Sequence, residues 1–398
     1  MIIILRKNSL TPENLIYIAF ASTFMPFFLT GIIIIFIGIY IMTNSKRRKA
    51  VFCHSGCSLL VVFTIYTALI GLFRNNYIGF LCSVGFFFII VIGYYARTFM
   101  TSNIFQHALD LCCLMCVFVF LSVAGERIIY SHIDNYRCVG WFFNSNYLCT
   151  MMALMIIVCV YKLIITHKGR LLYILTSFMC FFTMYLGGSI FSFIELAIGI
   201  LGLIIVYKKR RLLGLAAIIC SCIVVILYVA PETFPRILES NNSTELRILV
   251  WDSSIEFLKI NPIFGNGFLP YYHFHNLLGS LWKTTHTHNF LFESILSFGL
   301  VGTVIFLAFI WSYYEKVSEC KSLLRKNKTT NLILAVSTAT IIHCTVDLTI
   351  LWIQTGFFFI LILSGIGVDE KTLNRRIKAC LARSQKSIKT SEEEINNE

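Results

Sequence analysis

Long runs of apolar residues alternate with short polar segments along most of this chain. Each run has roughly the length that crosses a bilayer as an α-helix, about 20 residues. The runs cover 14–42, 51–73, 78–98, 108–124, 141–166, 171–186, 189–207, 212–230, 289–313, 331–348 and 351–365. The pattern predicts an all-α fold: a polytopic helical integral membrane protein with about eleven or twelve transmembrane helices.

The first apolar run leaves its number of helices open. It fits either one long tilted helix or a hairpin broken near Pro26. Arg6 and Lys7 precede the run and Lys46-Arg47-Arg48-Lys49 follows it. Basic residues prefer the cytoplasmic side of a membrane, so both clusters are expected there. This placement favours the hairpin and puts both termini in the cytoplasm.

Alternating sides from the basic cluster at 46–49 gives a consistent topology, because the other basic loops also fall inside. The segment 231–288 then lies outside, where its acidic residues offset its basic ones. We predict four parts. N-terminal transmembrane helices occupy 1–230, and a large periplasmic loop at 231–288 carries active-site residues. C-terminal transmembrane helices occupy 289–367, and a cytoplasmic tail occupies 368–398.

The composition excludes an ordinary soluble domain. Hydrophobic residues make up 57% of the chain and charged residues 13%, whereas soluble domains carry about 25% charged residues. The formal net charge is +13, but the basic clusters mostly flank apolar runs, where they orient helices. A lipid bilayer is therefore the expected partner and nucleic acid is not. Most of the 15 cysteines lie inside apolar runs, where cysteine acts as a small hydrophobe.

The external loop contains the pattern of a helix that begins near Asn242 or Ser243. Apolar residues recur at helical spacing at Ile248, Trp251, Ile255 and Leu258. Asn261-Pro262 is expected to end the helix. Such a helix would lie on the membrane surface or cover a cavity. Arg247 lies four residues before Trp251, on the same face, although an ordinary surface arginine fits the pattern too.

The most informative polar stretch, His286-Thr287-His288-Asn289, stands where this loop enters the next apolar run. A histidine there could act as a general base near neutral pH, or simply cap the helix. Glu293 follows one turn after Asn289 and is either catalytic or a buried acid that fixes packing. Gly299 and Gly302 are expected to let another helix approach closely.

Two other kinds of site stay open. Zinc could bind the histidines of the loop, although no H-E-x-x-H motif supports this; these are His273, His275, His286 and His288. Ionisable residues at membrane depth mark transport paths, so a transporter is the alternative of another class, with Asp110, Glu195 and Asp347 on its path. The chain has no phosphate-binding loop and no G-x-S-x-G elbow. An enzyme is therefore expected to act without cofactor or metal on an activated substrate.

One combination of motifs resembles the O-antigen ligase and O-antigen polymerase superfamily, the lipid-linked glycan transferases of bacterial surface polysaccharide and lipopolysaccharide biosynthesis. It comprises Arg247-x-x-x-Trp251, Pro262, Gly265-x-Gly267, His288-Asn289 and Gly299-x-x-Gly302-Thr303. The resemblance implies an inverting glycosyltransferase of the inner membrane that works at the periplasmic face. The donor would be a saccharide on undecaprenyl pyrophosphate. The acceptor would be a lipid-linked repeat, for a polymerase, or lipid A-core, for a ligase. A chain-length regulator is a further candidate partner.

The resemblance also implies roles for individual residues. His288 is expected to be the general base, and Arg247 to hold the pyrophosphate. Asn289 or Glu293 is expected to orient the imidazole, and His286 and Trp251 to contact substrate.

The chain departs from the family at one place. Where the family often has Ser-Arg-Gly, this chain has Gly188-Ser189-Ile190. A second phosphate-binding cation must therefore come from elsewhere, and the candidates are Arg236, Lys283, Arg127 and Arg137. The missing arginine favours the polymerase.

Overall fold

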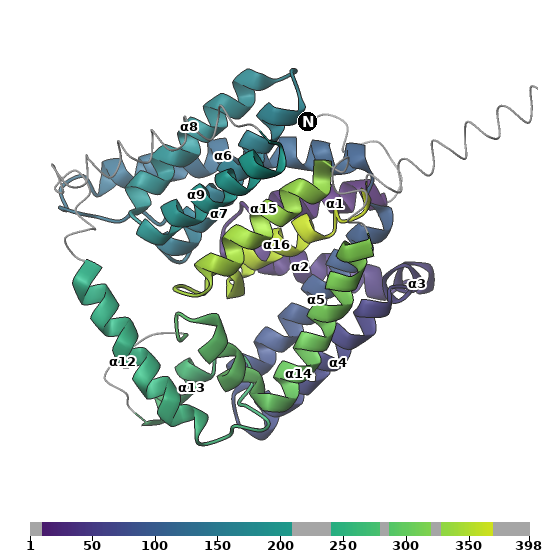
Figure 1. The fold of residues 1–398 in the computed structure, drawn as a ribbon, viewed down its shortest axis with the longest axis vertical. Helices are drawn as coiled ribbons and strands as arrows, with labels where there is room; N and C mark the ends of the chain where they lie inside the picture. The colour runs from purple at the N-terminus through teal and green to yellow at the C-terminus, as the bar shows by residue number, and fades with distance from the viewer. Residues whose placement is uncertain (1–9, 209–239, 279–285, 320–327, 369–398) are drawn as a thin grey trace, which may run out of the picture.

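A computed structural model describes residues 10–208, 240–278, 286–319 and 328–368 (Figure 1). Within these residues the fold is all-helical, as predicted, with no strands. In chain order the elements are α1 (Pro12–Ser22), α2 (Phe27–Met42), α3 (Ser45–Phe52), α4 (Ser55–Phe73), α5 (Tyr77–Phe99), α6 (Ser102–Ile129), α7 (Ser145–Ile165), α8 (Arg170–Gly187), α9 (Ile190–Val206), α12 (Ser240–Leu258), α13 (Pro270–Leu278), α14 (Phe290–Glu319), α15 (Lys328–His343), the 3-10 turn η4 (Thr349–Leu351) and α16 (Ile353–Leu363).

The first apolar run is broken near Pro26, as the hairpin prediction requires. Helix α1 ends at Ser22 and α2 begins at Phe27, because proline has no N–H to continue the helical ladder. The hydroxyl of Thr30 donates to the Ser22 carbonyl at 2.7 Å and ties the two helices together. Helix α2 then bends by 103° into α3, which carries the basic cluster.

The described residues include six helices that are long and apolar enough to cross a membrane, or seven if the bent α2–α3 pair is one span. Exposed apolar side chains such as Phe36 and Phe178 cover their outer surfaces, which suits contact with lipid. The protein is therefore a multi-pass membrane protein. This count is below the prediction of about eleven or twelve transmembrane helices. Helices α9 and α16 are apolar but shorter, and the predicted span 212–230 lies outside the described residues.

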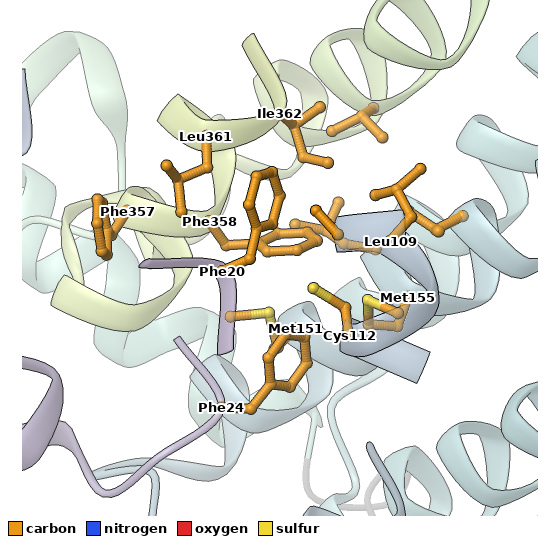
Figure 2. Close-up of a cluster of buried hydrophobic side chains, with 14 of the residues drawn as sticks. Phe20, Phe24, Leu109, Cys112, Met151, Met155, Phe357, Phe358, Leu361 and Ile362 are labelled. Carbon is orange, nitrogen blue, oxygen red and sulfur yellow. The ribbon is translucent and has the colours of Figure 1, made fainter. Parts of the chain in front are cut away.

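Helix α7 forms the centre of the molecule, buried along nearly its whole length between α8, α9 and α15 (Figure 1). Figure 2 shows the adjoining core, where Phe20, Phe24 and Phe358 meet sulfur-bearing side chains such as Cys112 and Met151. Edge-to-face ring contacts order it, with centroids 6.3 Å apart for Phe20–Phe358 and 5.7 Å for Phe24–Phe358. The buried cysteines act as small hydrophobes, as predicted.

Helices α12 and α13 lie together at one side of the molecule, at the lower left of Figure 1. The predicted loop helix is confirmed as α12, which ends at Leu258 before Asn261-Pro262. Its predicted start at Asn242 or Ser243 is wrong, since the helix already begins at Ser240. The apolar–polar pattern did not predict α13. Helix α13 packs on α12 through the rings of Tyr271 and Phe257, 5.5 Å apart.

The predicted span 289–313 is not one straight helix. Gly299 has φ 59° and ψ −170°, which breaks α14 into two arms. The rings of Phe290 and Phe306 lie 6.3 Å apart, although a straight helix would separate these positions by about 24 Å. The arm Phe290–Phe298 therefore folds back toward the arm that follows Gly299, which brings Phe290 close to Phe306.

Candidate active site

The segment 286–289 is fixed by the cap of the helix that follows it. The Asn289 side-chain oxygen accepts from the backbone N–H groups of Leu291 (2.9 Å) and Phe292 (3.3 Å), which is an N-cap. The Asn289 amide donates to the Thr345 carbonyl at 3.0 Å. Asn289, rather than His288, therefore caps α14, and it also ties the segment to the loop after α15.

His288 adopts a left-handed backbone conformation, with φ 56°. This region is unfavourable for a residue with a Cβ and costs of order 1–3 kcal/mol. Strain of this kind persists where surrounding contacts over-determine the conformation. At His288 those contacts are the N-cap on one side and a carboxylate on the imidazole.

That carboxylate is Asp347, which lies 59 residues further along the chain. His288 Nδ1 is 2.9 Å from Asp347 Oδ1, and His286 Nε2 is 3.3 Å from the same oxygen. The backbone N–H of Leu348 also donates to Oδ1 at 2.8 Å, and Asn146 Nδ2 donates to Oδ2 at 2.6 Å. Asp347 thus gathers both histidines of the motif around one carboxylate whose side chain is only 3% exposed.

Burial and these hydrogen bonds set the charges of the cluster. Burial alone would raise the pKa of Asp347, but hydrogen bonds from His286 and His288 hold it well below its usual range. Burial lowers the pKa of His286, and the charges of His288 and Arg247 act in the same direction against the bond to Asp347. The cluster near pH 7 therefore contains an ionised carboxylate and a neutral His286.

The two histidines differ in access. The His288 side chain is 25% exposed, whereas the His286 side chain is 8% exposed. With Nδ1 on Asp347, the imidazole of His288 turns its Nε2 edge away from the carboxylate. His288 is therefore the member of the pair that can meet a substrate, and His286 supports the carboxylate.

Helix α12 is anchored to this segment by Trp251. The indole N–H donates to the Thr287 carbonyl at 2.9 Å, and its ring lies 6.2 Å from that of Phe292. Arg247 lies one helical turn away on the same face, with its guanidinium 4.7 Å from the ring centroid of Phe191. The structure thus brings together His286, His288 and the Arg247–Trp251 face, as the sequence predicts.

Glu293 has a different partner from the one predicted. Its carboxylate accepts from the backbone N–H of Thr287 at 2.9 Å and is only 2% exposed. This bond closes the turn that carries His288. Asp347 is thus the hydrogen-bonding partner that orients the His288 ring, in place of Asn289 or Glu293. Glu293 fits the packing role that the sequence left open.

The loop that follows α12 fills the break in α14. Backbone N–H groups of Leu300 and Val301 donate to the carbonyls of Pro262 and Ile263, at 2.9 and 3.0 Å. A Cβ on Gly299 would lie 2.4 Å from the Ile263 oxygen. The helix-packing prediction is therefore wrong for Gly299, where a loop backbone makes the close approach. It is confirmed for Gly302, whose surface contacts Tyr66 of α4.

The predicted zinc set is not what the structure assembles. Among the described residues, one group of three has ligand atoms within 4.8 Å of one another: His286, His288 and Asp347. His273 lies on α13 and bonds to the backbone at Arg74 instead. The side chain of His275 lies outside the described residues. Because the Asp347 oxygens already accept from four donors, we interpret the group as a hydrogen-bonded cluster.

The other two acids of the transport alternative, Asp110 and Glu195, lie in separate pairs. Asp110 bonds to Lys162 at 2.7 Å, and Glu195 lies 2.9 Å from His343. Each is matched by its own basic partner, so the contacts do not favour a continuous transport path. Of the three acids proposed for that path, Asp347 alone belongs to the histidine cluster.

The remaining candidate cations separate into two groups. Arg236 and Lys283 lie outside the described residues. Arg127 donates to the carbonyl of Ile133 at 3.4 Å. Arg137 reaches the cluster, because it donates to the oxygen of Asn146 at 2.8 Å. No sequence pattern pointed to Asn146, which looks like an ordinary polar residue at the start of an apolar run.

Comparison with known proteins agrees with the motif. No curated protein matches the chain. Residues 171–307 match the family model described as O-antigen ligase. The matched segment contains the Arg247–Trp251 face, both histidines of the cluster and the Gly299 break, whereas Asp347 lies beyond it. The segment 171–307 is therefore similar to the O-antigen ligase family.

Proposed function

We propose that this protein transfers a glycan from undecaprenyl pyrophosphate to a sugar hydroxyl at the periplasmic face of the bacterial inner membrane, with inversion at the anomeric carbon. The contact that carries the proposal is the 2.9 Å bond between His288 Nδ1 and Asp347. It gives the accessible histidine a fixed ring orientation and an ionised partner, next to the helix that carries Arg247.

The proposed base is His288. Its Nε2 accepts the proton of the acceptor hydroxyl as the oxygen attacks the anomeric carbon. The imidazolium that forms is stabilised by the adjacent ionised Asp347, in the way that a carboxylate supports the histidine of a hydrolase triad. Asp347 itself is a positioning residue, because it acts through the ring.

The proposed clamp for the leaving group is Arg247. As the new oxygen–carbon bond forms, the bond from the anomeric carbon to the phosphate oxygen breaks, and undecaprenyl pyrophosphate departs as an anion. A guanidinium can bind such an anion through two parallel hydrogen bonds. Because pyrophosphate is already a good leaving group, the reaction requires no nucleotide and no metal. Trp251 holds Arg247 in register with the base through its bond to Thr287.

The acceptor decides between polymerase and ligase. The sequence argument for a polymerase rested on the arginine missing at Gly188-Ser189. The argument weakens, because a Cβ on Gly188 would lie 3.7 Å from Nε of Arg137. Another part of the chain thus supplies a cation at this position, and the proposal covers both acceptors.

Deleting the gene and resolving lipopolysaccharide on a gel tests the proposal. Loss of a polymerase leaves core that carries a single repeat. Loss of a ligase leaves bare core, while polymer accumulates on its lipid carrier. Full-length protein should restore the ladder, and the His288→Ala and Arg247→Ala variants should not, although both still insert in the membrane. An unchanged ladder after deletion would contradict the proposal.

A further inference from the structure

We propose that Arg137 and Asn146 are positioning residues, which hold Asp347 in the orientation that binds His288. The proposal rests on the function proposed above and extends it to two side chains outside the segment 171–307 that the family model matches. Arg137 lies in the loop between α6 and α7, and Asn146 lies in the first turn of α7. Arg137 and Asn146 are 9 residues apart, whereas Asp347 lies 201 residues beyond Asn146, and hydrogen bonds join the three side chains.

The amide of Asn146 has a single allowed orientation. Arg137 Nη2 donates to its oxygen at 2.8 Å, and its own Nδ2 donates to Asp347 Oδ2 at 2.6 Å. A guanidinium can only donate and an ionised carboxylate can only accept. Turning the amide over would place donor against donor and acceptor against acceptor, so Arg137 decides which face of Asn146 meets Asp347.

The two carboxylate oxygens of Asp347 accept hydrogen bonds from different donors. Oδ2 takes the amide of Asn146, whereas Oδ1 takes His288, His286 and the backbone N–H of Leu348. Rotating the carboxylate would break both sets of bonds. Asn146 therefore fixes the angle at which Oδ1 faces the imidazole of His288, and the correct angle directs Nε2 of that ring toward the acceptor.

Arg137 is itself held in place by a hydrogen bond to α8 and by the closed conformation of its own loop. Its Nε donates to the Gly187 carbonyl at 3.0 Å, at the end of α8. The carboxylate of Glu126 accepts from the backbone N–H groups of Val139 and Gly140, at 3.0 and 2.6 Å, and from the Tyr136 hydroxyl at 2.7 Å. These contacts close the loop around the arginine. A half-buried guanidinium fixed at this point can hold the amide without large motion.

The charge of Arg137 also bears on the cluster. Among the described residues, the charged or titratable groups that act on the two imidazoles or on Asp347 include Arg247, Glu293 and His343. Arg137 adds a positive charge behind Asn146, on the side of Asp347 opposite the histidines. Removing that charge, or adding a negative one, should make the imidazoles retain their protons to higher pH.

The test uses the full-length protein in lipid nanodiscs, with lipid-linked saccharides extracted from the deletion strain as substrate. Transfer is measured against pH for the wild type and for Asn146→Asp, Arg137→Gln and Arg137→Lys. The matched control is Arg127→Gln, which removes a guanidinium near the same loop that donates to the carbonyl of Ile133. A second readout is carbethoxylation of His288 by diethylpyrocarbonate, which requires the neutral imidazole and no turnover.

We expect Asn146→Asp to move the acidic limb of the pH–rate profile upward by about one pH unit, because a second carboxylate then lies against Asp347 and adds negative charge near the imidazoles. Arg137→Gln should move the limb in the same direction by less. Arg137→Lys keeps the charge and should leave the limb in place, and so should the Arg127 control. The pH at which His288 becomes reactive toward diethylpyrocarbonate should shift in the same order among the variants.

If the acidic limb of the pH–rate profile stays in place in both Asn146→Asp and Arg137→Gln, the positioning role is overturned. This holds whatever the amount of folded protein. If Arg137→Gln raised the KM for the donor and left the acidic limb in place, Arg137 would instead bind the pyrophosphate. That result would also overturn the positioning role. Absence of transfer by the wild type would contradict the proposed function. In that case, carbethoxylation still decides whether Asn146 controls the ring of His288.

Discussion

Individual residues in this site take roles that their sequence spacing does not reveal. His286 and His288 look equivalent in the motif, yet burial separates a neutral supporting ring from an accessible one. We therefore expect His288→Gln to lower transfer by about 10²- to 10⁴-fold, the usual contribution of a general base. Asp347→Asn should cost a similar factor, because the amide cannot stabilise the imidazolium. His286→Gln should cost less.

These three variants are compared at equal amounts of inserted protein, by initial rate of transfer from lipid-linked saccharide. If His286→Gln lost as much activity as His288→Gln, the assignment of the base would have to be exchanged between the two rings. Retention of wild-type rates by Asp347→Asn would show that the carboxylate is not needed to orient or support the base.

The buried His286 also predicts how stability depends on pH. Its folded-state pKa is lowered by burial, whereas an unfolded histidine titrates near about 6.5. The unfolded state therefore binds the proton more readily, and stability falls as pH drops below about 6.5 toward the folded pKa. Asp347 has a depressed folded pKa, so its contribution is lost only below the unfolded pKa of about 3.9.

Thermal unfolding in detergent between about pH 7.5 and 5.5 measures this effect. His286→Asn should reduce the slope of melting temperature against pH. His132→Asn is the matched control, because His132 lies exposed in the α6–α7 loop and should leave the slope as it is. Equal slopes in the wild type and in His286→Asn would show that His286 does not titrate with unfolding.

Among the helices, α14 shows where sequence pattern stops being informative. Its apolar composition resembles a single span, but the carbonyls of Pro262 and Ile263, 38 residues upstream, accept from the N–H groups of Leu300 and Val301 after the break. Tyr66 adds a hydroxyl that lies 2.6 Å from the Phe264 carbonyl and 3.0 Å from that of Phe298. Composition cannot encode a backbone partner that arrives from another segment. By contrast, α12 was predictable, because its apolar stripe and Asn261-Pro262 are local signals.

The break predicts a sharp difference between two glycines. Gly299→Ala places a Cβ 2.4 Å from the Ile263 oxygen in a conformation that is essentially reserved for glycine, and should cost about 1–3 kcal/mol or more. Gly85→Ala on α5 meets nothing within 4 Å and should be neutral or slightly stabilising. Melting temperatures of both variants in the same detergent test this. A tolerated Gly299→Ala would mean that the loop does not close on α14 as described.

For the whole molecule, the sequence predicted the helical membrane fold and the meeting of His288 with the Arg247–Trp251 face. Both follow from strong local signals, apolar periodicity and a compact motif. It did not predict the partner of His288, because Asp347 follows a different helix and its pairing depends on how α15 packs beside α7. Asn146 was missed for the same reason, and Arg137 was named only as a candidate phosphate-binding cation. Polar residues scattered over distant helices acquire a shared role only when the helices pack.

The arrangement of the helices also predicts sidedness. Helix α4 begins beside the basic helix α3 and ends near Asn76, whose amide donates to the carbonyls of Asn266 and Phe268 in the large loop. The 19 residues of α4 span about 28 Å, close to the thickness of the bilayer hydrocarbon. The basic cluster and the loop therefore face opposite sides of the membrane. The positive-inside rule then puts α3 in the cytoplasm.

A membrane-impermeant maleimide tests this in intact cells. The exposed Cys53 beside α3 should react only in inverted vesicles. A cysteine placed at the exposed Lys259, at the end of α12, should react from the periplasm. The charge pattern and the packing of α4 are independent reasons for this orientation, so labelling of Cys53 from outside would contradict both. It would also place His288 and Asp347 on the cytoplasmic side, which contradicts the proposed function.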